Sequence, residues 1–295
     1  MLKRLKQFLE AAALNGIFAL IRLMPVRAAS ALGGRLARAL GPLSNAHRTA
    51  LKNLKRAFPE KSETEIAAIV KAMWDNIGRT AFEYPHLDKF ICHRPGEDMP
   101  GGNVEVIGSE YAAQLRDDGK AGIFFSGHLA NWEVPALAIV YNGVPPYSFF
   151  RAPNNPYASK VFRHRQLGHG ELMPKGAEGA RRAIQHLNAG RHLGILVDQK
   201  MNDGIPVPFF GRDAMTAPAL AQFALKYDIP VVPVGIERLE GTRMRVTFYK
   251  PIPIRKTANR QDDILAAMTN VNKVIESWIR KRPEQWLWVH NRWPE

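Results

Sequence analysis

The order of apolar and polar residues follows two different patterns on either side of a break at residues 93–103. Before the break, apolar residues recur at helical spacing, and Ser62 to Glu65 has the form of a capping box that starts a helix. The break has the sequence HRPGEDMPGGN and is rich in Pro and Gly. Beyond it, short apolar runs alternate with amphipathic stretches, which predicts strands interleaved with helices.

The second pattern predicts a particular order of elements. Strands are expected at 123–125, 192–198, 231–237 and 244–250, and helices at 128–140, 178–190, 216–227 and 264–279, with Thr216 as the N-cap of the third. This alternation predicts an α/β fold with a mostly parallel central sheet flanked by helices. With 295 residues, the chain is long enough for one such domain over 61–295, with a helical segment at 1–60 packed on it.

Basic charge is concentrated at the start of the chain. Residues 1–60 contain eleven Lys and Arg against two Glu, so they hold +9 of a net charge of +14. The apolar run AAALNGIFALI at 11–21 is shorter than the roughly 20 residues that a membrane-spanning helix needs. We interpret it as part of a basic helix that lies in a membrane interface; a cleaved signal peptide, a full span and a plain core helix are the alternatives.

The composition narrows the class of function. A net charge of +14 with a pI near 10 indicates an anionic partner, which can be nucleic acid, an anionic membrane or an acidic substrate. Cys92 is the one cysteine, so an internal disulfide and a CxxC metal site are excluded, and a reducing compartment fits. The chain has no GxSxG, Walker A, HExxH or dinucleotide-binding pattern, and we expect neither a cofactor nor a metal.

Candidate chemistry appears where two predicted strands end. FFSGHLANWE (124–133) delivers His128 after a buried strand and Glu133 five residues later, while GILVDQ places Asp198 and Gln199 after another strand. Ligands of such sheets bind beyond the carboxyl ends of the strands, so we expect these four residues to be neighbours. His128 and Glu133 are the candidate catalytic pair, a general base and its orienter. The alternative is a histidine that caps a helix beside an unrelated surface glutamate.

Five motifs in order extend this pattern over nearly the whole chain. They are GHLANWE, FFRAPNNP, GILVDQ, PFFGRDAMTAPALA (208–221) and the terminal PEQWLWVHNRW (283–293). With them the sequence resembles the lipid A biosynthesis acyltransferases, the late lauroyl and myristoyl transferases of Gram-negative bacteria. The wider glycerolipid acyltransferases are also similar, but they usually carry Asp five residues after the His and an FPEGTRS-like block, which this chain lacks.

The resemblance implies transfer of a fatty acyl chain from acyl carrier protein to the hydroxyl of a 3-hydroxyacyl chain on a lipid A precursor, usually one carrying Kdo. His128 would be the general base, steadied by Glu133, and no acyl-enzyme is needed. The implied location is the cytoplasmic face of the inner membrane. The basic charge fits three anionic partners: the phosphates and Kdo carboxylates of the acceptor, the acidic carrier protein and the anionic leaflet. Nucleic acid is then not expected as a partner.

Substrate contacts are expected from a further set of residues, each with a plainer alternative. Arg151 and Arg163 would bind a phosphate or the oxyanion, or belong to a solvated basic face. Asp198 and Gln199 would orient the acceptor or support the His–Glu pair, or form an internal helix cap. Phe210 and Gly211, with Phe209, would line the acyl pocket or belong to the core, and Asn131 is a further candidate. Four of the six Trp lie in 278–293, which suits a membrane interface or core packing.

Two rival functions remain. One is acylation of another glycolipid or of a phospholipid. The other is a basic protein without catalysis that binds membrane or nucleic acid, and it would be indifferent to changes at His128 and Glu133.

Overall fold

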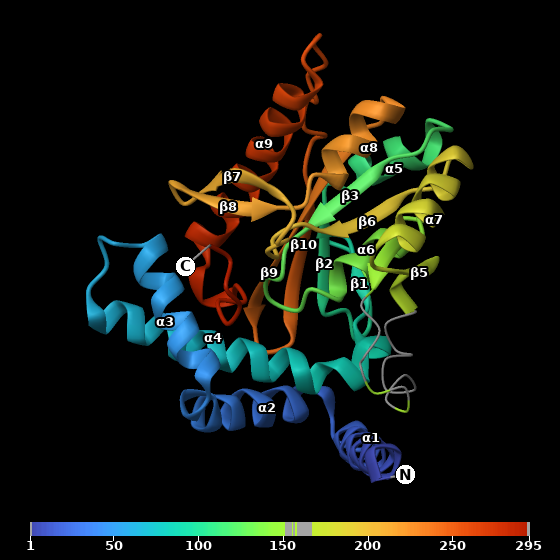
Figure 1. Cartoon of the computed structure of the whole chain (residues 1–295). Helices are drawn as coiled ribbons and strands as arrows, with labels where there is room; N and C mark the ends of the chain where they lie inside the picture. Colours follow the sequence, from blue (N-terminus) through green and yellow to red (C-terminus); the bar gives the residue numbers. More distant parts are fainter. Residues whose placement is uncertain (1, 151–154, 156, 158–166, 294–295) are drawn as a thin grey trace.

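Helices that precede the first strand stack at one end of the molecule (Figure 1). The computed structural model describes residues 2–150, 155, 157 and 167–293. The N-terminal helices are α1 (Leu2–Arg22), α2 (Val26–Leu40), α3 (Asn45–Ala57) and α4 (Glu63–Glu83), with short 3₁₀ segments η1 (Gly41–Leu43) and η2 (Tyr84–Lys89). The expected capping box starts α4, since the Ser62 side chain accepts from the Glu65 backbone and the Glu65 side chain accepts from the Ser62 backbone.

Helix α2 packs against α4 along a line of glycines. A Cβ on Gly33 would collide with the carbonyl oxygen of Gly78, and a Cβ on Gly78 would collide with that of Gly33. Small residues at both positions therefore let the two helix backbones approach closely. Through α4, the N-terminal helices become a layer under one edge of the sheet (Figure 1).

The centre of the molecule is a sheet whose order in the described part of the chain is β1-β2-β10-β9-β3-β6-β4-β5. Neighbouring strands are parallel except at the β9–β10 hairpin, which is antiparallel. The strands are β1 (Cys92–His93), β2 (Val104–Ile107), β3 (Ile123–Ser126), β4 (Tyr147–Phe150), β5 (Glu171–Pro174), β6 (Leu193–Leu196), β9 (Val231–Glu240) and β10 (Arg243–Phe248). A separate hairpin pairs β7 (Ile205–Phe209) with β8 (Arg212–Thr216). The α/β class with a mostly parallel sheet is confirmed.

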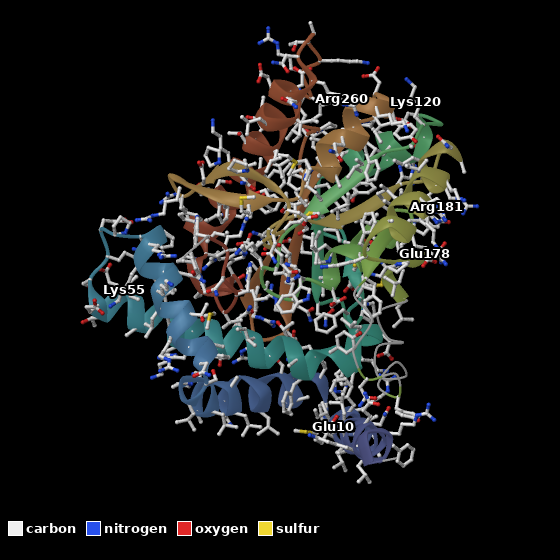
Figure 2. All side chains as sticks on the ribbon, in the orientation of Figure 1. Glu10, Lys55, Lys120, Glu178, Arg181 and Arg260 are labelled. Carbon is white, nitrogen blue, oxygen red and sulfur yellow. The ribbon has the colours of Figure 1, made fainter. Side chains whose placement is uncertain are left out.

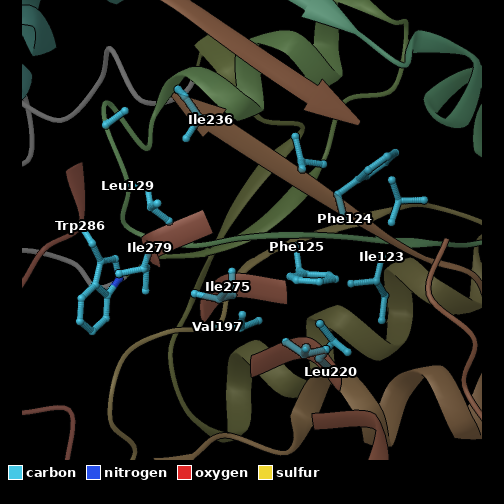
Figure 3. Close-up of a cluster of buried hydrophobic side chains, with 14 of the residues drawn as sticks. Ile123, Phe124, Phe125, Leu129, Val197, Leu220, Ile236, Ile275, Ile279 and Trp286 are labelled. Carbon is cyan, nitrogen blue, oxygen red and sulfur yellow. The ribbon is translucent and has the colours of Figure 1, made fainter. Parts of the chain in front are cut away.

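The remaining helices flank this sheet: α5 (Ser109–Asp117), α6 (Val134–Tyr141), α7 (Ala177–Asn188), α8 (Ala219–Tyr227) and α9 (Arg260–Lys281), followed by η4 (Pro283–Gln285). Alternate residues of β3 point to opposite faces. Phe125 stacks on Trp278 of α9, whereas Phe124 and Ser126 face the side that α6 covers. Figure 3 shows the core on the α9 side, where Ile123, Phe125 and Ile275 gather with Trp286 at its end.

Two predicted elements differ from the structure. The helix expected at 128–140 begins only at Val134, because Ala130 has a positive φ of 46° and Leu129 forms a β-bridge with Trp286. Thr216 does not cap α8. It ends β8, its hydroxyl donates to the carbonyl of Ala214, and α8 starts after Pro218.

Candidate active site

The register of two parallel strands brings His128 and Asp198 together. Ser126 of β3 pairs with Leu196 of β6. His128 and Asp198 each follow one of these paired residues by two positions. His128 and Asp198 then lie at the carboxyl edge of the sheet, as the sequence predicts. The backbone N–H of His128 donates to Oδ2 of Asp198 at 2.6 Å, which fixes the loop on the end of β6.

The loop that carries His128 is also held from the C-terminal segment. The carbonyl of His128 accepts from the Leu287 N–H at 3.1 Å, and Ala130 N–H donates to the carbonyl of Gln285 at 2.9 Å. Ala130 adopts the left-handed region, which is unfavourable for a residue with a Cβ and persists where the surroundings enforce it. The strained turn therefore points His128 at the site, instead of letting the helix begin there.

The imidazole of His128 is bonded on both nitrogens. Its Nδ1 lies 2.7 Å from Oδ1 of Asp198, and its Nε2 lies 3.2 Å from Nε2 of Gln199. Because an ionised carboxylate only accepts, the proton of a neutral ring belongs on Nδ1, which leaves the Nε2 lone pair to accept from the Gln199 amide. The ring is partly accessible, whereas the Asp198 side chain is fully buried.

Asp198 remains ionised in this buried place. Burial alone would raise its pKa, but attraction to the protonated form of His128 and hydrogen bonds from His128 and Trp286 outweigh that effect and hold the pKa below its ordinary value. The indole N–H of Trp286 donates to Oδ2 at 2.7 Å. A charged acceptor with several donors keeps the imidazole in one tautomer and can stabilise its protonated form.

Glu133 has a different place from the one expected of an orienter. It is the N-cap residue of α6, its N–H donates to Oδ1 of Asn131 at 3.3 Å, and its buried side chain lines a pocket between α6 and the sheet. The carboxylate that the structure places on Nδ1 of His128 is that of Asp198. We therefore assign the orientation of His128 to Asp198, and a catalytic contribution of Glu133 stays a prediction.

The pocket beside Glu133 is mostly apolar. It encloses about 550 Å³, including the part open to solvent, and its walls include Phe124, Ile139, Phe149 and Leu196. Ser126, Glu133, Ser148 and His169 supply polar groups. Such a lining fits an apolar ligand that also carries polar groups.

Asn131 belongs to a buried polar network beneath the loop. Its amide donates to Oε2 of Glu83 at 3.0 Å, and Glu83 also pairs with Arg238 and accepts from Ser30 at 2.7 Å. Arg238 in turn donates to Asn76 at 2.9 Å. Asn131 is fully buried and both ends of its amide are engaged, so the geometry assigns it to holding the loop, while a substrate contact by Asn131 stays a prediction.

The other predicted contacts are placed less centrally. Phe210 and Gly211 form the turn of the β7–β8 hairpin with positive φ values of 52° and 70°, and Phe210 packs on Phe58 and beneath the guanidinium of Arg280. Neither of them lines the pocket beside Glu133. Arg151 and Arg163 lie outside the described residues.

Two further kinds of chemistry to consider in the described part of the chain are metal binding and thiol attack. No group of three His, Cys, Asp or Glu residues there could hold a metal ion. Cys92 is buried in β1, and burial raises the pKa of its thiol to about 12, which disfavours a thiolate nucleophile.

Trp286 is a residue of the site that the sequence pattern does not reveal. The density of Trp in the terminal motif predicts a membrane interface or core packing. Trp286 and Trp288 are fully buried, and their N–H groups donate to Asp198 and to the carbonyl of Pro283. The signal that could have revealed Trp286 is the terminal motif itself, which occurs together with the motifs of His128 and Asp198. Its sequence does not indicate that one of its tryptophans reaches the site.

Comparison with known proteins identifies the family of the chain. The family described as bacterial lipid A biosynthesis acyltransferase matches residues 2–295. A lipid A biosynthesis acyltransferase of Haemophilus influenzae is 25% identical over 281 residues, covering 93% of this chain and 85% of that protein. A lipid A biosynthesis myristoyltransferase of Escherichia coli is 26% identical over 272 residues, covering 91% and 82%. With a family match over essentially its whole length, the chain belongs to the bacterial lipid A biosynthesis acyltransferases.

Proposed function

We propose that this acyltransferase moves a fatty acyl chain from acyl carrier protein to the hydroxyl of a 3-hydroxyacyl chain on a lipid A precursor, usually one carrying Kdo. The observation that carries the proposal is the bonded pair His128–Asp198 at the sheet edge, with an apolar pocket close by at Ser126 and Glu133. A secondary hydroxyl is a poor nucleophile and needs a base beside it.

The chemistry follows from the state of the imidazole. The acceptor hydroxyl replaces the Gln199 amide at Nε2 of His128 and gives up its proton there as its oxygen attacks the thioester carbonyl. The new C–O bond forms, the C–S bond breaks, and the carrier thiolate takes the proton from the imidazolium. Asp198 stabilises the imidazolium throughout. No acyl-enzyme is formed.

The pocket suits the acyl chain of the donor or acceptor. Its apolar walls would bind methylene groups, and Ser126 and Glu133, from the segment that carries His128, would lie at the carbonyl end. A catalytic contribution of Glu133 would arise at this end, where its side chain lines the pocket.

The N-terminal helices suit the surface of an anionic membrane, and we propose that the protein works at the cytoplasmic face of the inner membrane. Large apolar side chains are exposed on α1 and α2 and just after each of them: Phe8, Leu9, Ile17, Leu20, Leu23, Leu32, Leu36, Leu40 and Leu43. Figure 2 shows side chains that project from these helices away from the body of the protein. Exposed Arg27 and Arg35 add positive charge. No helix in the described residues is long and apolar enough to cross a membrane.

The proposal is tested by the lipid product. Purified protein, incubated with acyl-carrier protein thioester and a Kdo-bearing lipid A precursor, should add the mass of one acyl chain to the precursor. His128→Ala should lower the rate by about 10²- to 10⁴-fold. His93→Ala, at the edge strand β1, should change it little.

The same experiment separates the rivals. Transfer to another glycolipid or a phospholipid, with none to the lipid A precursor, would reject the acceptor proposed here. Absence of any transfer, with membrane binding indifferent to His128→Ala, would favour a protein without catalysis.

A further inference from the structure

The indole N–H of Trp286 is the side-chain donor, besides His128, that the structure places on the Asp198 carboxylate. We infer that Trp286 is a positioning residue for acyl transfer: its N–H holds the carboxylate in the orientation that serves Nδ1 of His128. The inference rests on the proposed function, in which His128 takes the proton of the acceptor hydroxyl.

The two oxygens of Asp198 have separate tasks. Oδ1 faces Nδ1 of His128 at 2.7 Å, whereas Oδ2 accepts from the His128 backbone N–H at 2.6 Å and from Trp286 at 2.7 Å. Together the two donors on Oδ2 oppose rotation of the carboxylate about its C–C bond. Without the indole N–H, the donor that the described residues leave on Oδ2 is the backbone N–H of His128 itself.

Trp286 is itself rigidly held. Its ring lies edge-on to Trp288 with centroids 4.5 Å apart and packs against Phe209 at 5.7 Å. Its backbone forms a β-bridge with Leu129, and the next residue, Leu287, donates to the carbonyl of His128. One short segment therefore fixes both the backbone of His128 and the carboxylate behind its ring.

Two other ionisable side chains of the same segment, His290 and Arg292, lie within electrostatic reach of Asp198. Burial lowers the pKa of His290 and lowers that of Arg292 to about 10, while the charge of Asp198 opposes both shifts. Their hydrogen bonds go elsewhere, from Arg292 to Met215 and Thr216 and from His290 to Leu287. The directional contact from the C-terminal segment is thus the indole N–H.

The test compares Trp286→Phe with Trp288→Phe. Both tryptophans are fully buried, and both substitutions remove one indole N–H and similar volume, but Trp288 donates to the carbonyl of Pro283. Trp286→Phe should lower kcat about tenfold, as expected for a lost hydrogen bond to a charged group, with KM for donor and acceptor unchanged. The acidic limb of the pH profile of kcat/KM should move to lower pH, because a carboxylate that can turn away from Nδ1 stabilises the imidazolium less. Trp288→Phe should do neither.

A second variant removes the N–H and keeps the shape. In 3-benzothienylalanine, sulfur replaces the indole N–H. At position 286 this residue should lower kcat and move the pH profile as Trp286→Phe does, and it serves as the test if Trp286→Phe folds poorly. Wild-type kcat and an unmoved pH profile in the sulfur analogue would overturn the inference, as would equal losses in Trp286→Phe and Trp288→Phe.

A measurement independent of turnover separates this inference from the proposed function. The ring ¹⁵N signals of His128, assigned by their loss in His128→Asn, should shift in the 286 variants and stay in place in Trp288→Phe. If the wild-type protein transfers no acyl chain, the proposed function fails and these signals still decide whether Trp286 acts on His128. Unchanged ring signals would reject the role of Trp286.

Discussion

At the residue scale, the site depends on which carboxylate faces Nδ1 of His128. The sequence suggested Glu133, from the spacing in GHLANWE, and placed Asp198 nearby from the end of a second strand. The structure puts Asp198 at 2.7 Å from the ring and makes Glu133 an N-cap residue that lines the pocket. An orienting carboxylate acts by fixing the tautomer, so a neutral isostere at that position should harm catalysis far more than binding.

The first prediction separates the two carboxylates. Asp198→Asn should lower kcat by 10²- to 10⁴-fold, with little effect on KM, because the amide cannot stabilise the imidazolium. Glu133→Gln should lower kcat less than Asp198→Asn does. Steady-state transfer rates measure both, and Asp203→Asn, at an exposed position in the following loop, is the control. A greater loss in Glu133→Gln would return the orienting role to Glu133.

At the scale of elements, periodicity and strand ends predict β3, β6, β9 and β10, four of the eight strands of the described sheet, and the position of His128, Asp198 and Gln199. The start of α6 was not predictable from them, because a backbone bridge from Leu129 to Trp286, more than 150 residues away, delays the helix. The network of Glu83, Arg238 and Asn131 also joins distant segments. Local patterns report which face of an element is apolar, whereas contacts of this kind depend on the tertiary fold.

The second prediction concerns the contact of α2 with α4. Gly33→Ala should lower the free energy of unfolding by about 1–3 kcal/mol, because its Cβ would meet the carbonyl oxygen of Gly78, which belongs to a helix backbone and cannot yield easily. Gly16→Ala in α1, where a Cβ meets nothing within 4 Å, should change stability little or raise it by about 0.5–1 kcal/mol. Denaturant unfolding measures both. Equal effects would show that α2 does not depend on this close approach.

At the scale of the whole molecule, positive charge and exposed apolar side chains occur together on the N-terminal helices. Residues 1–60 carry +9 of the net +14, and the exposed leucines of α1 and α2 lie on the same layer beneath the sheet (Figure 1). The sequence pointed to residues 11–21 as the apolar element of this segment. The structure extends the apolar surface through α2 to Leu43, and this extension decides where a membrane contact should be tested.

The last prediction therefore uses α2. Leu36→Asp should weaken binding to vesicles of phosphatidylglycerol and phosphatidylethanolamine by about tenfold or more, since it removes an apolar side chain worth roughly 1.5–3 kcal/mol on burial and adds a like charge facing an anionic surface. Leu265→Asp is the matched control, because both leucines are 41% exposed but Leu265 lies in α9, whose start is at the opposite end of the molecule (Figure 1). Vesicle co-sedimentation measures binding, and activity on a detergent-dispersed acceptor should be retained in both variants.

Raised salt alone should release little of the wild-type protein from the vesicles, because apolar burial persists when charge is screened. Equal binding of the two variants, or clean release by salt, would show that α2 does not enter the membrane interface.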